Sequence, residues 1–128
     1  MDEGYTAFHN EGVEMRFARG DSTGGPSTVW FRLRGPVVAG EEPTPLQRVA
    51  AAADFGNGIS SEIDFRTTSF VNADLTVSVR RPPVGEWVCL DARTRFGAPG
   101  IAVAESELWD EDGRIGRAVQ HLVVEARP

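Results

Sequence analysis

The stretch LQRVAAAADFGNGIS, residues 46–60, decides the fold. The residues around the start of this stretch, 44–47, have the signature of a helix N-terminus. Thr44 suits the N-cap, Pro45 suits the first helical position, and Gln47 completes a capping box. We therefore predict one short helix that ends at Asp54, a carboxylate placed where a helix disfavours negative charge.

The predicted helix is slender because it consists largely of alanine. Its far side is also small, since Ala51 and Ala52 lie there, so it can pack closely on several sides. Gly56 is a natural breaker behind it. The apolar positions with helical spacing are Leu46, Val49, Ala50 and Ala53.

Most other segments alternate with period two, which is typical of strands. DEDG at 110–113 has the composition of a hairpin turn between the last two segments. Two strands before the helix and four after it predict an α+β fold, in which a curved antiparallel sheet of about six strands wraps one central helix. The expected one-sided rows are Val88, Leu90 and Ala92 in one strand, and Leu75, Val77 and Val79, facing away from Asp74, Thr76 and Ser78, in another.

The composition limits the class of protein. The 128 residues suit a single domain, 1–128, of which we expect 1–11 to be a flexible N-terminal segment. A net charge of −6 argues against nucleic-acid binding, and no apolar run is long enough for a membrane span. The single cysteine, Cys89, fits a reducing compartment, and with no signal peptide we expect a cytoplasmic protein. The two histidines are far apart, so we expect no metal site, and nothing indicates a cofactor.

Four stretches together resemble a known family. They are similar to the acyl-CoA thioesterase II type of hot-dog-fold proteins, and specifically to its C-terminal hot-dog domain. The resemblance runs from about residue 12 to the end and implies a hot-dog fold that hydrolyses acyl thioesters, with acyl-CoA as the expected substrate. The stretches are VWFRLRGPVV (29–38), GEEPTPLQRVAAAADFGNGIS (40–60), FVNADLTVSVRRPPVGEWVCLDARTRFG (70–97) and GIAVAESELWDEDGRIGRAVQHLVV (100–124).

The resemblance implies a catalytic set that orients a hydrolytic water. Its aspartate falls on Asp54 and its glutamine on Gln120, while the position of its threonine is occupied here by Asn72. An amide can still hydrogen-bond a water, so the site stays polar. By alternation Asn72 shares the polar strand face with Asp74, which we expect to be part of the site. Either a β-bulge turns Asn72 inward or that polar face lines the dimer cleft. Backbone N–H groups at the helix start are expected to polarise the thioester carbonyl.

Further residues are candidates for substrate binding and assembly. Gly56, Asn57 and Gly58 follow the helix directly, and Arg80 could join Arg81, Arg93, Arg95 and Arg117 around the phosphates of coenzyme A. The alternative for these arginines is a solvated face with local salt bridges. Because the family usually carries two hot-dog domains and this chain resembles the second, we expect a homodimer.

Two other functions remain open from the sequence. The domain could bind an acyl or polyketide-like ligand without hydrolysis, as an accessory module. It could also be a pathway enzyme, a dehydratase, isomerase or cyclase, that uses Asp54 as its base. Equilibrium binding without turnover would indicate the first, and a product other than free acid and thiol the second.

Overall fold

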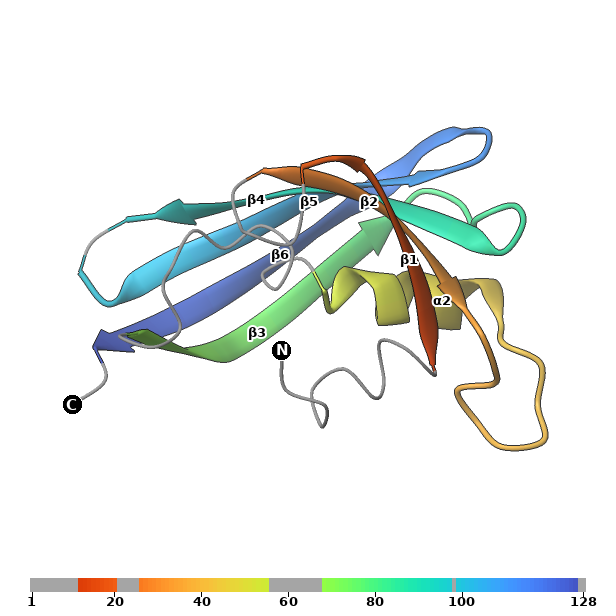
Figure 1. Ribbon diagram of the computed structural model, residues 1–128, viewed down its shortest axis with the longest axis horizontal. Helices are drawn as coiled ribbons and strands as arrows, with labels where there is room; N and C mark the ends of the chain where they lie inside the picture. Colours follow the sequence, from red (N-terminus) through yellow and green to blue (C-terminus); the bar gives the residue numbers. More distant parts are fainter. Residues whose placement is uncertain (1–11, 21–25, 56–67, 98, 127–128) are drawn as a thin grey trace.

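The computed structural model describes residues 12–20, 26–55, 68–97 and 99–126. These residues form one antiparallel sheet and one helix (Figure 1). The elements in chain order are β1 (Val13–Arg19), β2 (Ser27–Leu33), α2 (Pro45–Ala53), β3 (Thr68–Val79), β4 (Trp87–Phe96), β5 (Ile101–Asp110) and β6 (Gly113–Ala126). The sheet order is β1-β2-β4-β5-β6-β3, so β1 and β3 are the edges. The predicted α+β fold with six strands is confirmed.

The helix begins as its sequence predicts. Thr44 is the N-cap, and its hydroxyl accepts a hydrogen bond from the Gln47 N–H at 3.1 Å. The Gln47 amide oxygen accepts one from the Thr44 N–H at 2.9 Å, which completes the capping box. At the other end Asp54 is the C-cap, and its N–H donates to the carbonyl of Ala50 at 3.3 Å.

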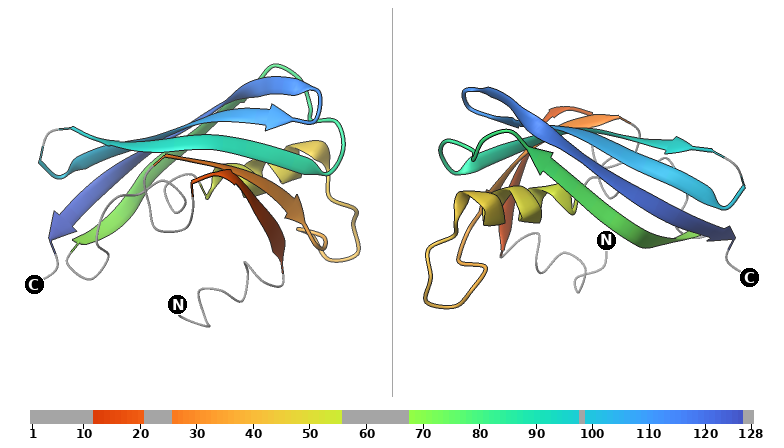
Figure 2. Two further views of the ribbon diagram at one scale, coloured as in Figure 1. Left: turned by 45° about the horizontal axis from the view of Figure 1, so that its top comes forward. Right: turned by 180° about the vertical axis from the view of Figure 1, so that it is seen from behind.

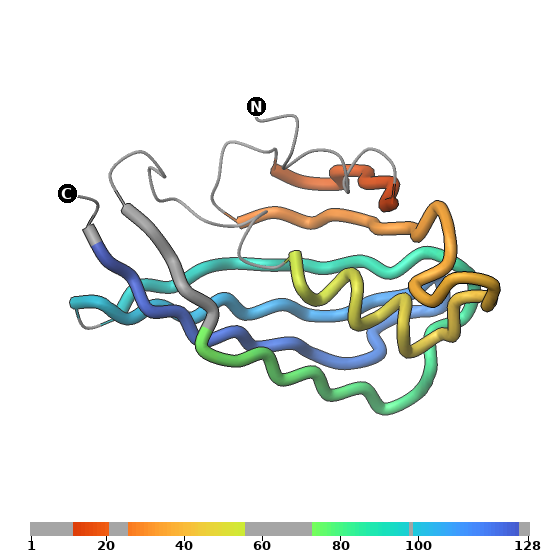
Figure 3. Tube along the Cα trace, turned by 90° about the horizontal axis from the view of Figure 1, so that it is seen from below, coloured from red at the N-terminus to blue at the C-terminus, as the bar shows by residue number. Residues whose placement is uncertain are grey.

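The helix lies against one face of the curved sheet, here called the inner face (Figures 2 and 3). The opposite face is called the outer face. The buried residues of α2 are Val49, Ala52 and Ala53. The prediction that Leu46 belongs to the apolar face is wrong, because 56% of Leu46 is exposed. Two overlapping sets of positions on this helix have helical spacing. One is 46, 49, 50 and 53, and the other is 49, 52 and 53. Contact with the sheet buries the second set.

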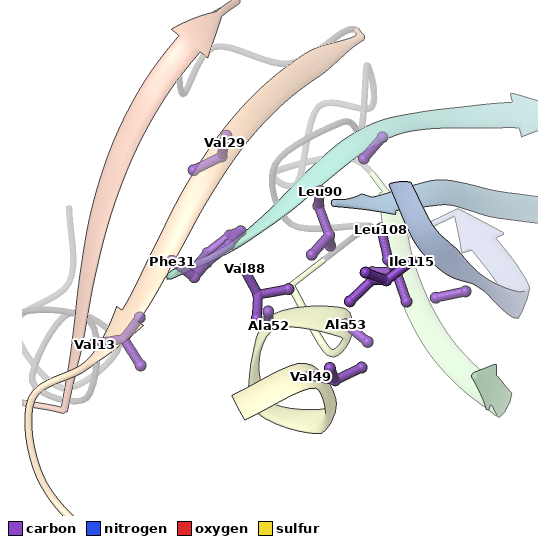
Figure 4. Close-up of a cluster of buried hydrophobic side chains, with 12 residues drawn as sticks. Val13, Val29, Phe31, Val49, Ala52, Ala53, Val88, Leu90, Leu108 and Ile115 are labelled. Carbon is purple, nitrogen blue, oxygen red and sulfur yellow. The ribbon is translucent and has the colours of Figure 1, made fainter. Parts of the chain in front are cut away.

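The core lies between α2 and the inner face (Figure 4). Leu90, Leu108 and Ile115 come from β4, β5 and β6 and are fully buried. Burial of each stabilises the fold by about 1.5–3 kcal/mol. Alanines at 52 and 53 let the helix approach these side chains closely. The other core members include Val13, Val29, Phe31, Val49, Val88, Ala92 and Ala118.

A buried ion pair closes one end of the sheet. The Asp110 side chain is 0% exposed and pairs with Arg81 at 2.5 Å, which joins the β3–β4 connection to the β5–β6 hairpin. The carboxylate also accepts hydrogen bonds from the backbone N–H groups of Val84, Asp112 and Gly113. These hydrogen bonds, the Arg81 pair first, lower the pKa of Asp110 well below its usual value. The predicted DEDG turn is therefore present, and its first residue anchors a second loop.

Candidate active site

Gln120 is a buried polar residue where the helix ends over β6. Only 2% of it is exposed, and its Nε2 donates to the backbone carbonyl oxygen of Asp54 at 3.4 Å. This contact joins residues 66 positions apart in the chain. The two residues that the sequence proposes as carboxylate and amide of one site are therefore neighbours in the fold.

The surroundings of Gln120 are small and apolar. In the sheet register it lies between Ala104 on β5 and Leu75 on β3. Ala102, Ala104 and Leu122 form a second buried cluster beside it, separate from the core under the helix. The polar amide thus marks the boundary between the main core and an apolar, alanine-lined part of the inner face.

Asp54 is at the exposed end of α2. Its backbone N–H continues the helix, while its carbonyl receives the Gln120 amide. A carboxylate at a helix C-terminus gains nothing from the helix dipole, so the helix itself does not explain this aspartate. The structure leaves its side chain accessible to water.

The helix start lies apart from this site within the chain. The helix α2 is nine residues long, which corresponds to about 13 Å. Its first N–H groups lie at the far end from Asp54, and the Thr44 hydroxyl already accepts one of them, from Gln47. Within one chain they therefore lie away from Asp54, and their role in polarising the thioester carbonyl stays a prediction.

A β-bulge separates Asn72 from Asp74 in the register of β3. Asn72 is opposite Leu122, whereas Asp74 is opposite the exposed His121. The bulge, at Ala73, adds one residue to β3. The bulge that the sequence analysis left open as an alternative is therefore present. In this register the partner of Asn72, Leu122, is two residues from Gln120 along β6.

Asp74 has a partner that the sequence analysis missed. Its Oδ1 accepts the His121 backbone N–H at 3.0 Å and lies 2.7 Å from His121 Nδ1. The hydrogen bonds from His121 lower the pKa of the Asp74 carboxyl. No local pattern could reveal this contact, since the two residues are 47 positions apart.

The arginines do not gather beside Gln120. Arg80 donates to the backbone carbonyl of Arg114 at 2.6 and 3.1 Å, and Arg81 is held by Asp110. Arg95 pairs with Glu105 on the outer face at 3.4 Å. An outer-face groove of about 510 Å³ contains Arg93, Arg95, Arg114 and Arg117 among Asp91, Glu105 and Glu107. Strand alternation thus puts the groove arginines on the face opposite Gln120, and local salt bridges account for Arg81 and Arg95.

The remaining candidates offer no other reactive centre. Cys89 is 2% exposed, and burial raises the pKa of its thiol to about 12, so it is inert as expected. The described residues contain no group of histidine, cysteine and carboxylate side chains that could hold a metal ion, and no helix among them is long and apolar enough to cross a membrane. Gly56, Asn57, Gly58 and the segment 1–11 lie outside the described residues.

A six-stranded antiparallel sheet curved around one helix is the architecture of a hot-dog-fold protein. The chain belongs to the acyl-CoA thioesterase C-terminal domain family, whose model matches residues 3–124. No curated protein matches it significantly.

Solved structures share this fold. Acyl-CoA thioesterase II TesB2 from Mycobacterium marinum superposes with a TM-score of 0.67 at 16% identity, covering 93% of this chain and 51% of that one. A thioesterase from Haemophilus influenzae gives 0.67 at 17% identity, covering 94% and 82%. A hypothetical thioesterase protein from Streptococcus pneumoniae, solved with coenzyme A, gives 0.63 at 6% identity, covering 89% and 88%. The chain thus spans about half of the TesB2 protein and most of the other two.

Proposed function

We propose that the protein hydrolyses acyl thioesters, with acyl-CoA as the substrate class, at the site formed by Asp54, Asn72 and Gln120. The observation that carries the proposal is the contact between the Gln120 amide and the end of the Asp54-terminated helix. It unites two of the proposed residues from distant parts of the chain. Membership of a thioesterase family supports the reaction type.

In this mechanism Asp54 activates a water for attack on the thioester carbonyl. Its exposed carboxylate can accept the proton of that water as a general base. The buried Gln120 amide and the Asn72 amide fix the water or the carbonyl oxygen. No covalent intermediate is required, and the thiolate of coenzyme A leaves as the tetrahedral adduct collapses.

The proposed ligand is acyl-CoA. The structural neighbour from S. pneumoniae was solved with coenzyme A, which supports this choice. The cluster of Ala102, Ala104 and Leu122 beside Gln120 is suited to contact an acyl group, because its side chains are apolar and two of them are small. Gly56, Asn57 and Gly58 follow Asp54 and Phe55 in the chain and are proposed to contact the substrate.

We further propose that the working unit is a homodimer paired through β3. This strand is an edge of the sheet that the described residues form, where it pairs with β6. On its inner-face side Leu75 and Val77 are 38% and 36% exposed in the single chain, which is unfavourable for apolar side chains beside an open edge. A second copy added at this edge would continue the sheet and cover them.

The test is a thiol-release assay over a panel of acyl-CoA chain lengths, with size measurement on the same sample. Asp54→Asn and Gln120→Ala should each lower kcat by about 100-fold or more, the contribution expected of a general base and its partner. Arg95→Ala, an outer-face change, is the control and should match the wild type. Unchanged rates in folded Asp54→Asn and Gln120→Ala would refute the assignment, and binding of acyl-CoA without turnover would favour an accessory module.

A further inference from the structure

The bulge in β3 decides which residue of β6 lies opposite residue 72. From Leu75 to Val79 the register places Leu75 opposite Gln120 and Val79 opposite Gly116. Continued without a bulge, the same register would place residue 72 opposite Val123. The extra residue at Ala73 instead places it opposite Leu122. The bulge therefore shifts the backbone of residue 72 by one register position along β6.

The contact between Asp74 and His121 lies directly beside this bulge. The two residues form the first opposed pair after the register shift. The Asp74 carboxylate accepts the His121 N–H at 3.0 Å, so this strand group next to the bulge has a side-chain acceptor. The imidazole adds a second bond to the same oxygen, at 2.7 Å.

We propose that Asp74 and His121 are positioning residues for the site at Gln120. By bonding beside the bulge, they hold the register that places residue 72 opposite Leu122. Neither residue touches the substrate in this arrangement, because both occupy the outer face. The inference rests on the proposed function for its kinetic consequence.

The bond to the backbone separates this contact from an ordinary exposed ion pair. Exposed pairs of side chains contribute little to stability, and both side chains here are about half exposed, at 54% and 52%. The Asp74 carboxylate, however, also accepts a strand N–H. Among the described residues β3 pairs with β6 alone, so this bond acts on the strand pair that sets the register of residue 72.

The test combines kinetics with amide hydrogen exchange. Asp74→Ala removes the acceptor and should lower kcat for acyl-CoA hydrolysis by about 10- to 100-fold, with KM within about twofold, as expected when a catalytic group is misplaced by about 1 Å. Asp74→Asn keeps an oxygen that can accept the His121 N–H and should recover most of kcat. Thr76→Ala, an exposed change on the same strand, is the matched control and should behave as wild type.

Hydrogen exchange of the His121 amide proton tests its bond to Asp74 independently of an enzyme assay. It should be at least about 10-fold faster in Asp74→Ala than in the wild type or Thr76→Ala. Wild-type kcat in a folded Asp74→Ala variant overturns the positioning role, whatever the exchange rate. If the wild type hydrolyses no thioester, the proposed function fails, and exchange alone then decides the contact: a faster rate supports it and an unchanged rate overturns it.

Discussion

Asp110→Asn is expected to destabilise the fold by about 3–5 kcal/mol, the usual cost of breaking a buried ion pair. Oδ1 of Asp110 accepts from Arg81, Asp112 and Gly113, and Oδ2 accepts from Arg81 and Val84. An asparagine amide has one acceptor oxygen. In either orientation its NH₂ group faces at least two donors, and each unsatisfied donor costs about 1–3 kcal/mol.

The difference in stability between the wild type and Asp110→Asn should depend on pH, because the pKa of Asp110 is lowered in the folded protein. A carboxyl whose pKa is lower in the folded state contributes its full stability above its unfolded pKa and loses it as pH falls toward the folded pKa. The stability difference between wild type and Asp110→Asn should therefore stay constant from pH 7 to pH 5. It should narrow only below about pH 4, the range in which an unfolded aspartate binds a proton.

Urea unfolding followed by tryptophan fluorescence, at one fixed protein concentration, measures this difference. Asp112→Asn is the matched control, because Asp112 is exposed and contributes its backbone N–H rather than its carboxylate to the network. The reasoning is refuted if Asp110→Asn lies within about 1 kcal/mol of this control at pH 7. It is refuted equally if the difference already narrows between pH 7 and pH 5.

Two further predictions concern Gly116 and Cys89. In Gly116→Ala the new Cβ would lie 2.0 Å from the Ser78 carbonyl oxygen and 2.9 Å from Val79 Cα. Thermal unfolding should therefore show that the free energy of unfolding falls by about 3 kcal/mol or more. In the control Gly35→Ala the new Cβ meets nothing within 4 Å, so the free energy of unfolding should change by less than about 0.5 kcal/mol. Equal stability of the two variants would contradict the close β3–β6 approach. Burial raises the pKa of the Cys89 thiol to about 12. Cys89 should therefore not react with a chromogenic thiol reagent at pH 8 in the native protein, and it should react after unfolding in urea. Rapid labelling of the native protein would contradict this prediction.

The helix shows how far local sequence reaches. Its start, its proline and its capping box all lie within four residues, and the structure has each as predicted. Strand faces were equally readable: Val88, Leu90 and Ala92 alternate and all are buried. The sequence did not predict which face of the helix packs against the sheet, since Leu46 fits the helical spacing but is exposed. Two overlapping apolar faces exist on an alanine-rich helix, and contact with the sheet chooses between them.

The candidate site divides in the same way. The resemblance selects Asp54, Asn72 and Gln120 from the chain, and the structure adds that the Asp54 carbonyl and the Gln120 amide are in contact. Alternation puts Asn72 on the face of Asp74 and leaves a bulge between them as an alternative, and the register has that bulge at Ala73. The sequence could not decide between the two, because a bulge depends on how β3 pairs with β6.

The sequence by itself determined the helix and its caps, the six strands and the one-sided apolar rows, because these depend on neighbours within a few residues. Tertiary structure alone decided the register of β3, the Asp74–His121 contact, the Arg81–Asp110 pair and the position of Gln120 under the helix end. These contacts join residues 29 to 66 positions apart. Only the assembled sheet brings such residues together, since no local rule links side chains on different strands.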